Sequence, residues 1–183
     1  MEIVKTSIEG LVIIKPKVCK DKRGYFFESY NEKSLKEFLP EVNFVQDNES
    51  KSSYGVLRGL HFQKPPFEQS KLVRVIKGKV LDVALDLREK SKTFGSYKSI
   101  ILSEENKKQF FIPKGFAHGF LVLSNYAIFS YKVDNYYNKE SECGIRYDDK
   151  ELNIDWNICE NDIIVSEKDK KLYSLKKYLL ENE

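Results

Sequence analysis

The strongest constraint on the fold of this chain is an alternation of apolar and polar side chains with a period of two residues. In residues 80–87, Asp82, Ala84 and Asp86 fall on one side of an extended chain. The apolar side chains on the other side are Leu81, Val83, Leu85 and Leu87. Residues 116–122 follow the same period. Such alternation predicts β-strands whose two faces meet different surroundings.

Short segments of this kind recur along most of the chain, for example at residues 127–133, and Gly, Pro, Asn and Ser mark the connections between them. Helical periodicity is confined to residues 32–39, which end before Pro40, and to a stretch near residues 169–180. We therefore predict an all-β fold, a barrel or an antiparallel sandwich, with short N-terminal and C-terminal helices.

One connection resembles a hairpin. Residues 72–76 and 80–87 flank Lys77, Gly78 and Lys79, and glycine suits a tight turn between two strands. We predict that these two strands pair with each other.

Composition and charge exclude several classes of function. The chain of 183 residues fits one domain, which we place at residues 1–183. A net charge of +3, from 31 basic and 28 acidic residues, is too small for a nucleic-acid or membrane surface, and no apolar run approaches the length of a membrane span. The three cysteines form no CxxC pair, so we expect free thiols in a reducing cytoplasm.

The chain contains only two histidines, His61 and His118, and both lie in apolar segments interrupted by glycine. Each is either a core histidine satisfied by hydrogen bonds or an acid–base group of a pocket, because the histidine pKa lies nearest to neutral pH. A metal cage is disfavoured, since Gln63 stands where a second histidine ligand is wanted and Lys71 where a carboxylate is wanted. We expect no metal.

The densest set of polar side chains lies in residues 46–71 and includes Arg58 and His61. Strict alternation places these two residues on opposite faces of one strand. They can line one pocket only if the strand is bulged or bent, and Gly59 is the obvious place for that. Arg58 itself has two open interpretations, a clamp for phosphate or a surface arginine on the solvated face.

Proton transfer next to a carbonyl group is the chemistry that these residues could perform without a metal. His61 can act as the base, and Lys71 can stabilise the enolate oxygen. Tyr131, which shares a face with Phe129, can act as the acid on the far side of the carbon. From its position alone, a core tyrosine is the commoner explanation for Tyr131.

Nine segments, in order, closely resemble those of the dTDP-4-dehydrorhamnose 3,5-epimerase family of cupin-like enzymes that act on sugar nucleotides. They are residues 21–28, 46–48, 55–63, 71–75, 82–88, 93–95, 112–120, 131–132 and 166–169. The ordered set covers most of the chain and is far more specific than any one segment. Two departures are Ser70, where relatives often carry glycine, and residues 171–173, which replace a tail that often contains proline.

The resemblance implies a cupin-like jelly roll that works as a homodimer without metal or organic cofactor. It implies that His61 is the base and is oriented by Asp169, that Tyr131 is the acid on the opposite face, and that Lys71 polarises the C4 ketone. The residues implied to hold the nucleotide sugar, some of them from the partner subunit, are Arg23, Glu28, Gln46, Asn48, Arg58, His118, Glu142 and Lys168. Of these, Arg58 would face the diphosphate.

The implied reaction converts dTDP-4-dehydro-6-deoxy-D-glucose to dTDP-4-dehydro-L-rhamnose by inverting C5 and C3. The 4-keto group makes both neighbouring C–H bonds acidic, so one base and one acid could serve both carbons. Three alternatives remain open: an epimerase of another nucleotide-linked 4-keto-6-deoxy sugar at one or both carbons, a 3,4-ketoisomerase on the same fold, and a non-catalytic module that binds sugar nucleotides.

Overall fold

A computed structural model describes residues 1–181 and confirms the all-β fold. Its strands are β1 (Glu2–Lys5), β2 (Val12–Lys15), β3 (Cys19–Asp21), β4 (Gly24–Phe26), β5 (Gln46–Ser53), β6 (Leu57–Gln63), β7 (Lys71–Lys77), β8 (Lys79–Asp86), β9 (Tyr97–Ser103), β10 (Gln109–Ile112), β11 (Phe116–Val122), β12 (Tyr126–Val133) and β13 (Glu142–Gly144). The helices are α1 (Glu32–Lys36) and α2 (Leu175–Leu180), with 3₁₀ turns η1 (Glu160–Asp162) and η2 (Asp169–Lys171).

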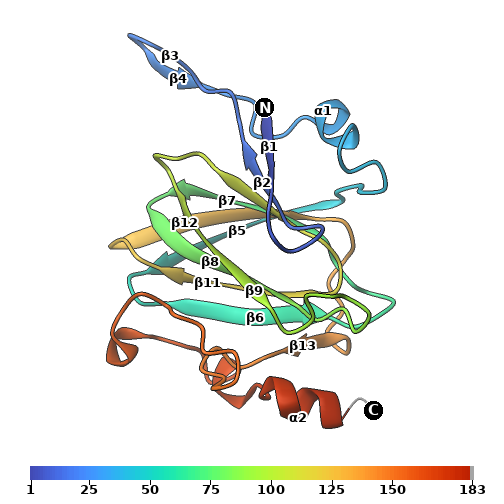
Figure 1. Cartoon of the computed structure of the whole chain (residues 1–183). Helices are drawn as coiled ribbons and strands as arrows, with labels where there is room; N and C mark the ends of the chain where they lie inside the picture. The colour runs from blue at the N-terminus through green and yellow to red at the C-terminus, as the bar shows by residue number, and fades with distance from the viewer. Residues whose placement is uncertain (182–183) are drawn as a thin grey trace.

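Two antiparallel sheets lie face to face (Figure 1). The six-stranded sheet has the order β1-β2-β10-β7-β12-β5, and the five-stranded sheet has the order β13-β6-β11-β8-β9. Because the two sheets remain separate, the fold is a sandwich rather than a closed barrel. The short β3–β4 hairpin belongs to neither sheet and projects away from the sandwich (Figure 1).

The predicted alternation fixes the two faces of β8. Its outer side, with Leu81 and Val83, packs against residues of the C-terminal segment such as Trp156. Its inner side carries Ala84, which packs between the sheets. The fully buried aspartates of β8 therefore lie on the side that faces the other sheet.

The predicted pairing of the strands around Gly78 is wrong. Strand β7 pairs with β10 and β12 in one sheet, whereas β8 pairs with β11 and β9 in the other. Gly78 carries the chain between the sheets with a φ of 82°, and a Cβ there would lie 2.1 Å from the backbone oxygen of Tyr126. The glycine is needed for this crossing and not for a hairpin.

The two helices are shorter than the periodicity predicted. The expected helix near residues 169–180 is interrupted after η2, because Tyr173 is extended and bridges to Ile145. Helix α2 begins afresh at Ser174, whose side chain caps it by accepting a hydrogen bond from the backbone N–H of Lys177. Within residues 1–181, no helix is both long and apolar enough to cross a membrane.

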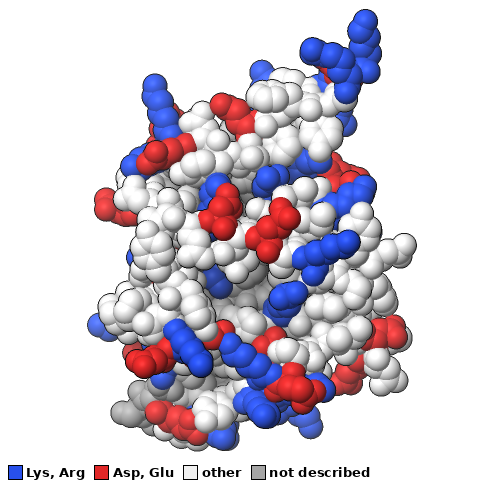
Figure 2. Space-filling view, turned by 180° about the vertical axis from the view of Figure 1, so that it is seen from behind, with Lys and Arg blue, Asp and Glu red and all other residues white. Residues whose placement is uncertain are grey.

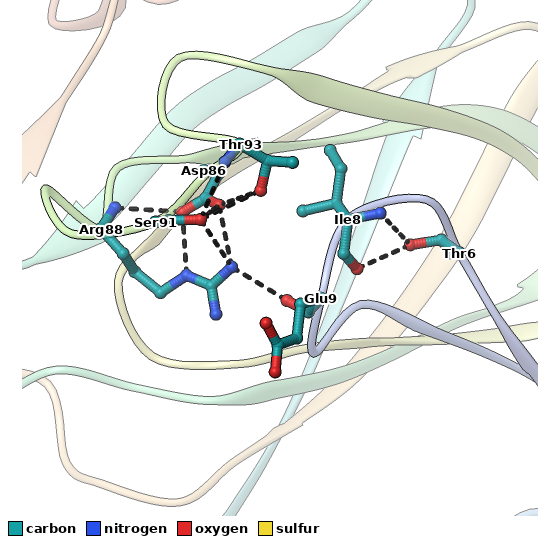
Figure 3. Close-up of polar contacts among 7 residues, drawn as sticks. All are labelled: Thr6, Ile8, Glu9, Asp86, Arg88, Ser91 and Thr93. Carbon is teal, nitrogen blue, oxygen red and sulfur yellow. Dashed lines mark hydrogen bonds and ion pairs between the residues drawn. The ribbon is translucent and has the colours of Figure 1, made fainter.

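Asp86, at the end of β8, anchors a polar cluster that joins two loops (Figure 3). Arg88 donates to both of its carboxylate oxygens, from Nε at 2.9 Å and from Nη2 at 2.8 Å, and the hydroxyls of Ser91 and Thr93 donate at 2.6 and 2.7 Å. Arg88 also donates to the backbone oxygen of Glu9 at 2.9 Å. Burial raises the pKa of Asp86, but these hydrogen bonds outweigh it and lower the pKa to about 2.

This cluster predicts a pH-dependent contribution to stability. The pKa of Asp86 is lower in the folded protein than in the unfolded chain, so the carboxylate stabilises the fold fully above about pH 4 and loses this effect as the pH falls toward 2. We expect Asp86→Asn to lower the free energy of unfolding by about 2 kcal/mol at pH 7, measured by urea unfolding. The difference from wild type should shrink between about pH 4 and pH 2.

The matched control is Glu2→Gln, which removes an exposed ion pair with Lys15 and should change the free energy of unfolding by less than about 0.5 kcal/mol. An Asp86→Asn effect no larger than that of the control, or one that is constant with pH, would contradict this explanation.

Candidate functional site

A cavity of about 650 Å³ lies between the two sheets and brings together most of the residues that the sequence singled out. One wall is the six-stranded sheet, a second is the five-stranded sheet, and a third is the segment of residues 164–169 that precedes and begins η2. The predicted site residues that line it are Asn48, Arg58, His61, Lys71, His118, Tyr131, Lys168 and Asp169.

Arg58 and His61 reach the same cavity because β6 is bulged. His61 pairs with His118 of β11, and Arg58 pairs with Phe120, so three steps along β6 match two steps along β11. The extra residue falls between the two pairs, where the sequence placed a bend at Gly59. The bulge therefore resolves the conflict between strict alternation and a shared pocket.

Gly59 permits a very close approach of the two strands at this bulge. Its φ is 122°, a region that favours glycine, and a Cβ at this position would lie 2.5 Å from Cα of Gly119 and 2.7 Å from the backbone oxygen of His118. A side chain here would have to push β11 away from β6.

Asp169 holds the His61 ring from the C-terminal segment. Its Oδ1 lies 2.8 Å from Nε2 of His61, its Oδ2 accepts from the backbone N–H of Gly59 at 3.4 Å, and its own N–H donates to Oγ of Ser166 at 3.1 Å. Burial raises the pKa of Asp169, but the contacts with His61, Gly59 and Ser166 lower it below the usual value. Since an ionised carboxylate only accepts, Nε2 carries the hydrogen and Nδ1 keeps its lone pair in the neutral ring.

Lys71 and Tyr131 stand on the opposite sheet. Nζ of Lys71 lies 3.5 Å from the backbone oxygen of His61, to which it donates. Burial lowers the pKa of Lys71 to about 8, and the charges of Asp82 and Glu142 oppose this effect. Burial raises the pKa of Tyr131, so its phenol keeps its proton at neutral pH. The cavity therefore has a possible base on one sheet and a possible acid on the other.

Asp82 is a buried polar residue of this region that was not predicted to belong to the site. Both of its carboxylate oxygens lie 3.0 Å from Nε2 of His118. A signal for it was present in the sequence, because an aspartate that alternates with Ala84 inside an apolar strand must find a partner when the strand is buried.

Basic side chains line the cavity and its rim, together with the acidic Glu49. Arg58, Lys71 and Lys168 line it, and Nε of Arg58 donates to Oγ of Ser52 at 3.1 Å. Lys168 forms an ion pair with Glu142, which also accepts from the hydroxyl of Tyr137. Figure 2 shows a hollow in one face of the molecule with basic side chains in it, and with both basic and acidic side chains around it. Such a rim suits an anionic ligand such as a phosphate.

Four predicted site residues do not line this cavity. Gln46 lies next to it and donates to Oδ1 of Asn48 at 2.8 Å, and Glu142 borders it through the ion pair with Lys168. Arg23 pairs with Asp21 on the projecting hairpin, with 84% of its side chain exposed, and Glu28 follows that hairpin. One copy of the chain therefore does not bring Arg23 and Glu28 to the site.

Within residues 1–181, no three His, Cys, Asp or Glu side chains gather in a way that could hold a metal ion. Around the cavity, the acids that meet the two histidines do so one at a time, Asp169 with His61 and Asp82 with His118. This arrangement is suited to moving protons and to orienting histidine rings.

The chain is similar to known sugar-nucleotide epimerases over almost its whole length. Residues 5–177 match the family model described as dTDP-4-dehydrorhamnose 3,5-epimerase. A relative of that name from Escherichia coli is 49% identical over 176 residues, which are 96% of this chain and 95% of that protein.

Solved structures give the same result. The crystal structure of dTDP-4-dehydrorhamnose 3,5-epimerase from Elizabethkingia anophelis aligns with a TM-score of 0.92 and 56% identity, covering 97% of each chain. A structure of the Legionella pneumophila dTDP-6-deoxy-D-glucose-3,5-epimerase in complex with dTDP-4-keto-L-rhamnose aligns with a TM-score of 0.92 and 50% identity, covering 96% of this chain and 93% of that one.

Because the strands approach so closely at Gly59, we expect the addition of one methyl group there to lower the stability of the fold. Gly59→Ala adds a Cβ within 3 Å of the β11 backbone, so we expect it to lower the free energy of unfolding by about 2 kcal/mol or more and to displace His61 from Asp169. Urea unfolding measures the first effect, and histidine ring NMR signals report the second.

Gly24→Ala is the matched control, because Gly24 has a similar φ of 129° but open space where its Cβ would lie. Equal destabilisation by the two substitutions would mean that backbone conformation, and not the contact between β6 and β11, makes Gly59 necessary.

Proposed function

The chain belongs to the dTDP-4-dehydrorhamnose 3,5-epimerase family, and from this we propose that it converts dTDP-4-dehydro-6-deoxy-D-glucose to dTDP-4-dehydro-L-rhamnose by inverting C5 and C3. It is an isomerase that acts on a sugar nucleotide. The observation that supports the proposal best is the cavity in which His61 on one sheet faces the sheet that carries Tyr131 and Lys71.

The first proposed step is removal of a proton from a carbon next to the C4 ketone. Nδ1 of His61 takes the proton, because Nε2 is occupied by the hydrogen bond to Asp169. The electron pair of the C–H bond moves to form an enolate, and the ammonium group of Lys71 stabilises the negative oxygen. A positioned base contributes roughly 10²–10⁴-fold and an oxyanion donor about 10²–10³-fold, so the reaction needs both groups.

The second proposed step returns a proton to the opposite face of the same carbon. The phenol of Tyr131 donates it, the enolate becomes a ketone again, and the configuration is inverted. One inversion leaves His61 protonated and Tyr131 deprotonated, and proton exchange with water restores both groups. The same two steps at the other neighbouring carbon complete the reaction, and no metal or organic cofactor takes part in them.

The remaining predicted residues are proposed to hold the nucleotide sugar. Arg58 and Lys168 provide positive charge for the diphosphate at the rim of the cavity. Asn48, with Gln46 hydrogen-bonded behind it, supplies polar groups on β5, and Glu142 fixes Lys168 through their ion pair. His118 lines the interior.

We propose that the active form is a homodimer in which Arg23 and Glu28 reach the partner's cavity. The supporting observation is the projecting β3–β4 hairpin, which exposes 57% of Tyr25 and 70% of Phe26 (Figure 1). Exposed aromatic residues next to a projecting arginine suit an arm that docks on a second copy.

We further propose one domain and a cytoplasmic location. A shared core between the sheets contains residues from Ile8 to Phe129, which supports a single unit. The cysteines at positions 19, 143 and 159 are free, as expected for a protein kept in a reducing compartment.

The proposed reaction predicts solvent hydrogen at two carbons of the product. In D₂O we expect deuterium at both C3 and C5, with inverted configuration at both, as measured by NMR of the product. His61→Asn should slow deuterium entry at least about 10³-fold, because the base is lost. Tyr131→Phe should keep deprotonation but impair delivery of the proton to the opposite face.

Several outcomes separate the alternatives. Deuterium at one carbon only indicates an epimerase of one centre, a moved carbonyl indicates a ketoisomerase, and tight binding without exchange indicates a binding module. Exchange at the wild-type rate in His61→Asn would show that the base is another group.

The proposed dimer predicts complementation between two inactive variants. Mixed dimers of Arg23→Ala and His61→Asn contain one intact site if Arg23 acts in the partner's cavity. Because half of the dimers in an equal mixture are mixed, we expect about a quarter of wild-type activity after unfolding and refolding the two variants together. No recovery of activity in verified mixed dimers would show that Arg23 does not act across the interface.

A further inference from the structure

The chain's second histidine is held in the same way as its first. His118 and His61 face each other as register partners on β11 and β6. Each ring meets a carboxylate through Nε2, His61 with Asp169 and His118 with Asp82. The proposed proton transfer uses only the first of these two pairs.

The second pair is the more deeply buried one. The side chain of His118 is 8% exposed and that of Asp82 is not exposed at all, whereas 30% of His61 is exposed. The His118 ring also stacks on Phe129, with 6.1 Å between ring centres and 22° between ring planes. The ring is thus held by a carboxylate at its edge and an aromatic ring at its face.

This contact determines which nitrogen of His118 faces the cavity. An ionised carboxylate only accepts, so Nε2 carries the hydrogen that points to Asp82. Among residues 1–181, Nδ1 of His118 has no hydrogen-bond partner. Every fully buried side-chain nitrogen or oxygen in these residues does have a partner, so Nδ1 of His118 is not fully buried. Nδ1 is therefore open to the cavity that His118 lines.

The titratable groups around Asp82 include a lysine from the other sheet. His118 on β11 is in direct contact with it, and Lys71 on β7 is close enough for Asp82 to raise its pKa against the effect of burial. His61 on β6 and Glu142 on β13 are the other titratable groups whose charges act on His118 or on Lys71. On β9, which pairs with β8 from the other side, the residue opposite Asp82 is the apolar Ile100.

We propose that Asp82 is a positioning residue of this site: it fixes the His118 ring with Nδ1 toward the sugar, and it serves as the buried counter-charge of the Lys71 ammonium group. Burial lowers the pKa of His118, and Asp82 opposes this effect only in part, so the ring is neutral at neutral pH. A neutral ring with hydrogen on Nε2 offers Nδ1 as an acceptor.

This assignment divides the recognition of the sugar between two side chains. Lys71, which can only donate, meets the ketone oxygen. Nδ1 of His118, which can only accept, meets a hydroxyl of the sugar ring. The inference rests on the proposed function for the identity of the sugar, but the state of the ring can be tested without any substrate.

The first experiment reads the tautomer of His118 in the wild-type protein. Because the chain has only two histidines, ¹⁵N labelling of histidine gives two ring systems, and the His61→Asn variant assigns them. We expect two-bond ¹H–¹⁵N spectra at pH 7.5 to show His118 neutral, with hydrogen on Nε2. A ring with hydrogen on Nδ1, or a doubly protonated ring, would overturn the proposal whatever the enzyme's activity.

The second experiment measures the pH dependence of deuterium exchange. Wild type should lose activity above about pH 8 as Lys71 loses its proton. Asp82→Asn keeps the shape but removes the charge, so we expect the alkaline limb of kcat to move down by about one pH unit. Asp86→Asn, the same change four residues along the same face of β8 and outside the cavity, should lower stability without moving the limb.

If the alkaline limb of the kcat–pH profile is unchanged in folded Asp82→Asn, Asp82 is not the counter-charge of Lys71. If that variant does not fold, the tautomer of the wild-type ring still decides the orientation of His118. Absence of the proposed epimerase activity would leave the spectra unchanged, so the two failures are distinguishable.

Discussion

Buried carboxylates fix the polar side chains that meet them, both in the cavity and beside it. An ionised carboxylate without partners in a protein interior is so costly that it is retained only where donors converge on it. Asp86 gathers an arginine and two hydroxyls, Asp169 holds His61, and Asp82 holds His118. Since an ionised carboxylate can only accept, each contact also fixes where a hydrogen resides. The chemistry proposed for the cavity depends on this property.

The sandwich explains how this pocket can place reactive groups on both faces of one carbon. A sugar ring between facing sheets presents one face to each, so a base and an acid on opposite sheets meet opposite sides of the same carbon. His61 comes from the five-stranded sheet, and Tyr131 and Lys71 come from the six-stranded sheet. The bulge at Gly59 turns the side chains of β6 into this space. The C-terminal segment then closes it with Asp169.

Local patterns in the sequence predicted the strands, their buried faces and the bend at Gly59, because each depends on neighbouring residues. Long-range pairing was less accessible, as the sheet crossing at Gly78 shows: a glycine between two strands looks the same in a hairpin and in a crossing. The partnership of His61 with Asp169 came from family resemblance, since the two residues are far apart in the chain. Asp82 was overlooked because its partner lies on another strand.

The proposed reaction requires His61 and Tyr131 to act on opposite faces of one carbon. A crystal structure of the protein with a bound dTDP-linked 4-keto sugar or an unreactive analogue tests it most directly. We expect Nδ1 of His61 and the hydroxyl oxygen of Tyr131 to lie within about 3.5 Å of C5 or C3, one on each side of the sugar ring, with Nζ of Lys71 at the C4 oxygen. Both groups on the same side of the ring, or a sugar bound outside the space between the sheets, would contradict it.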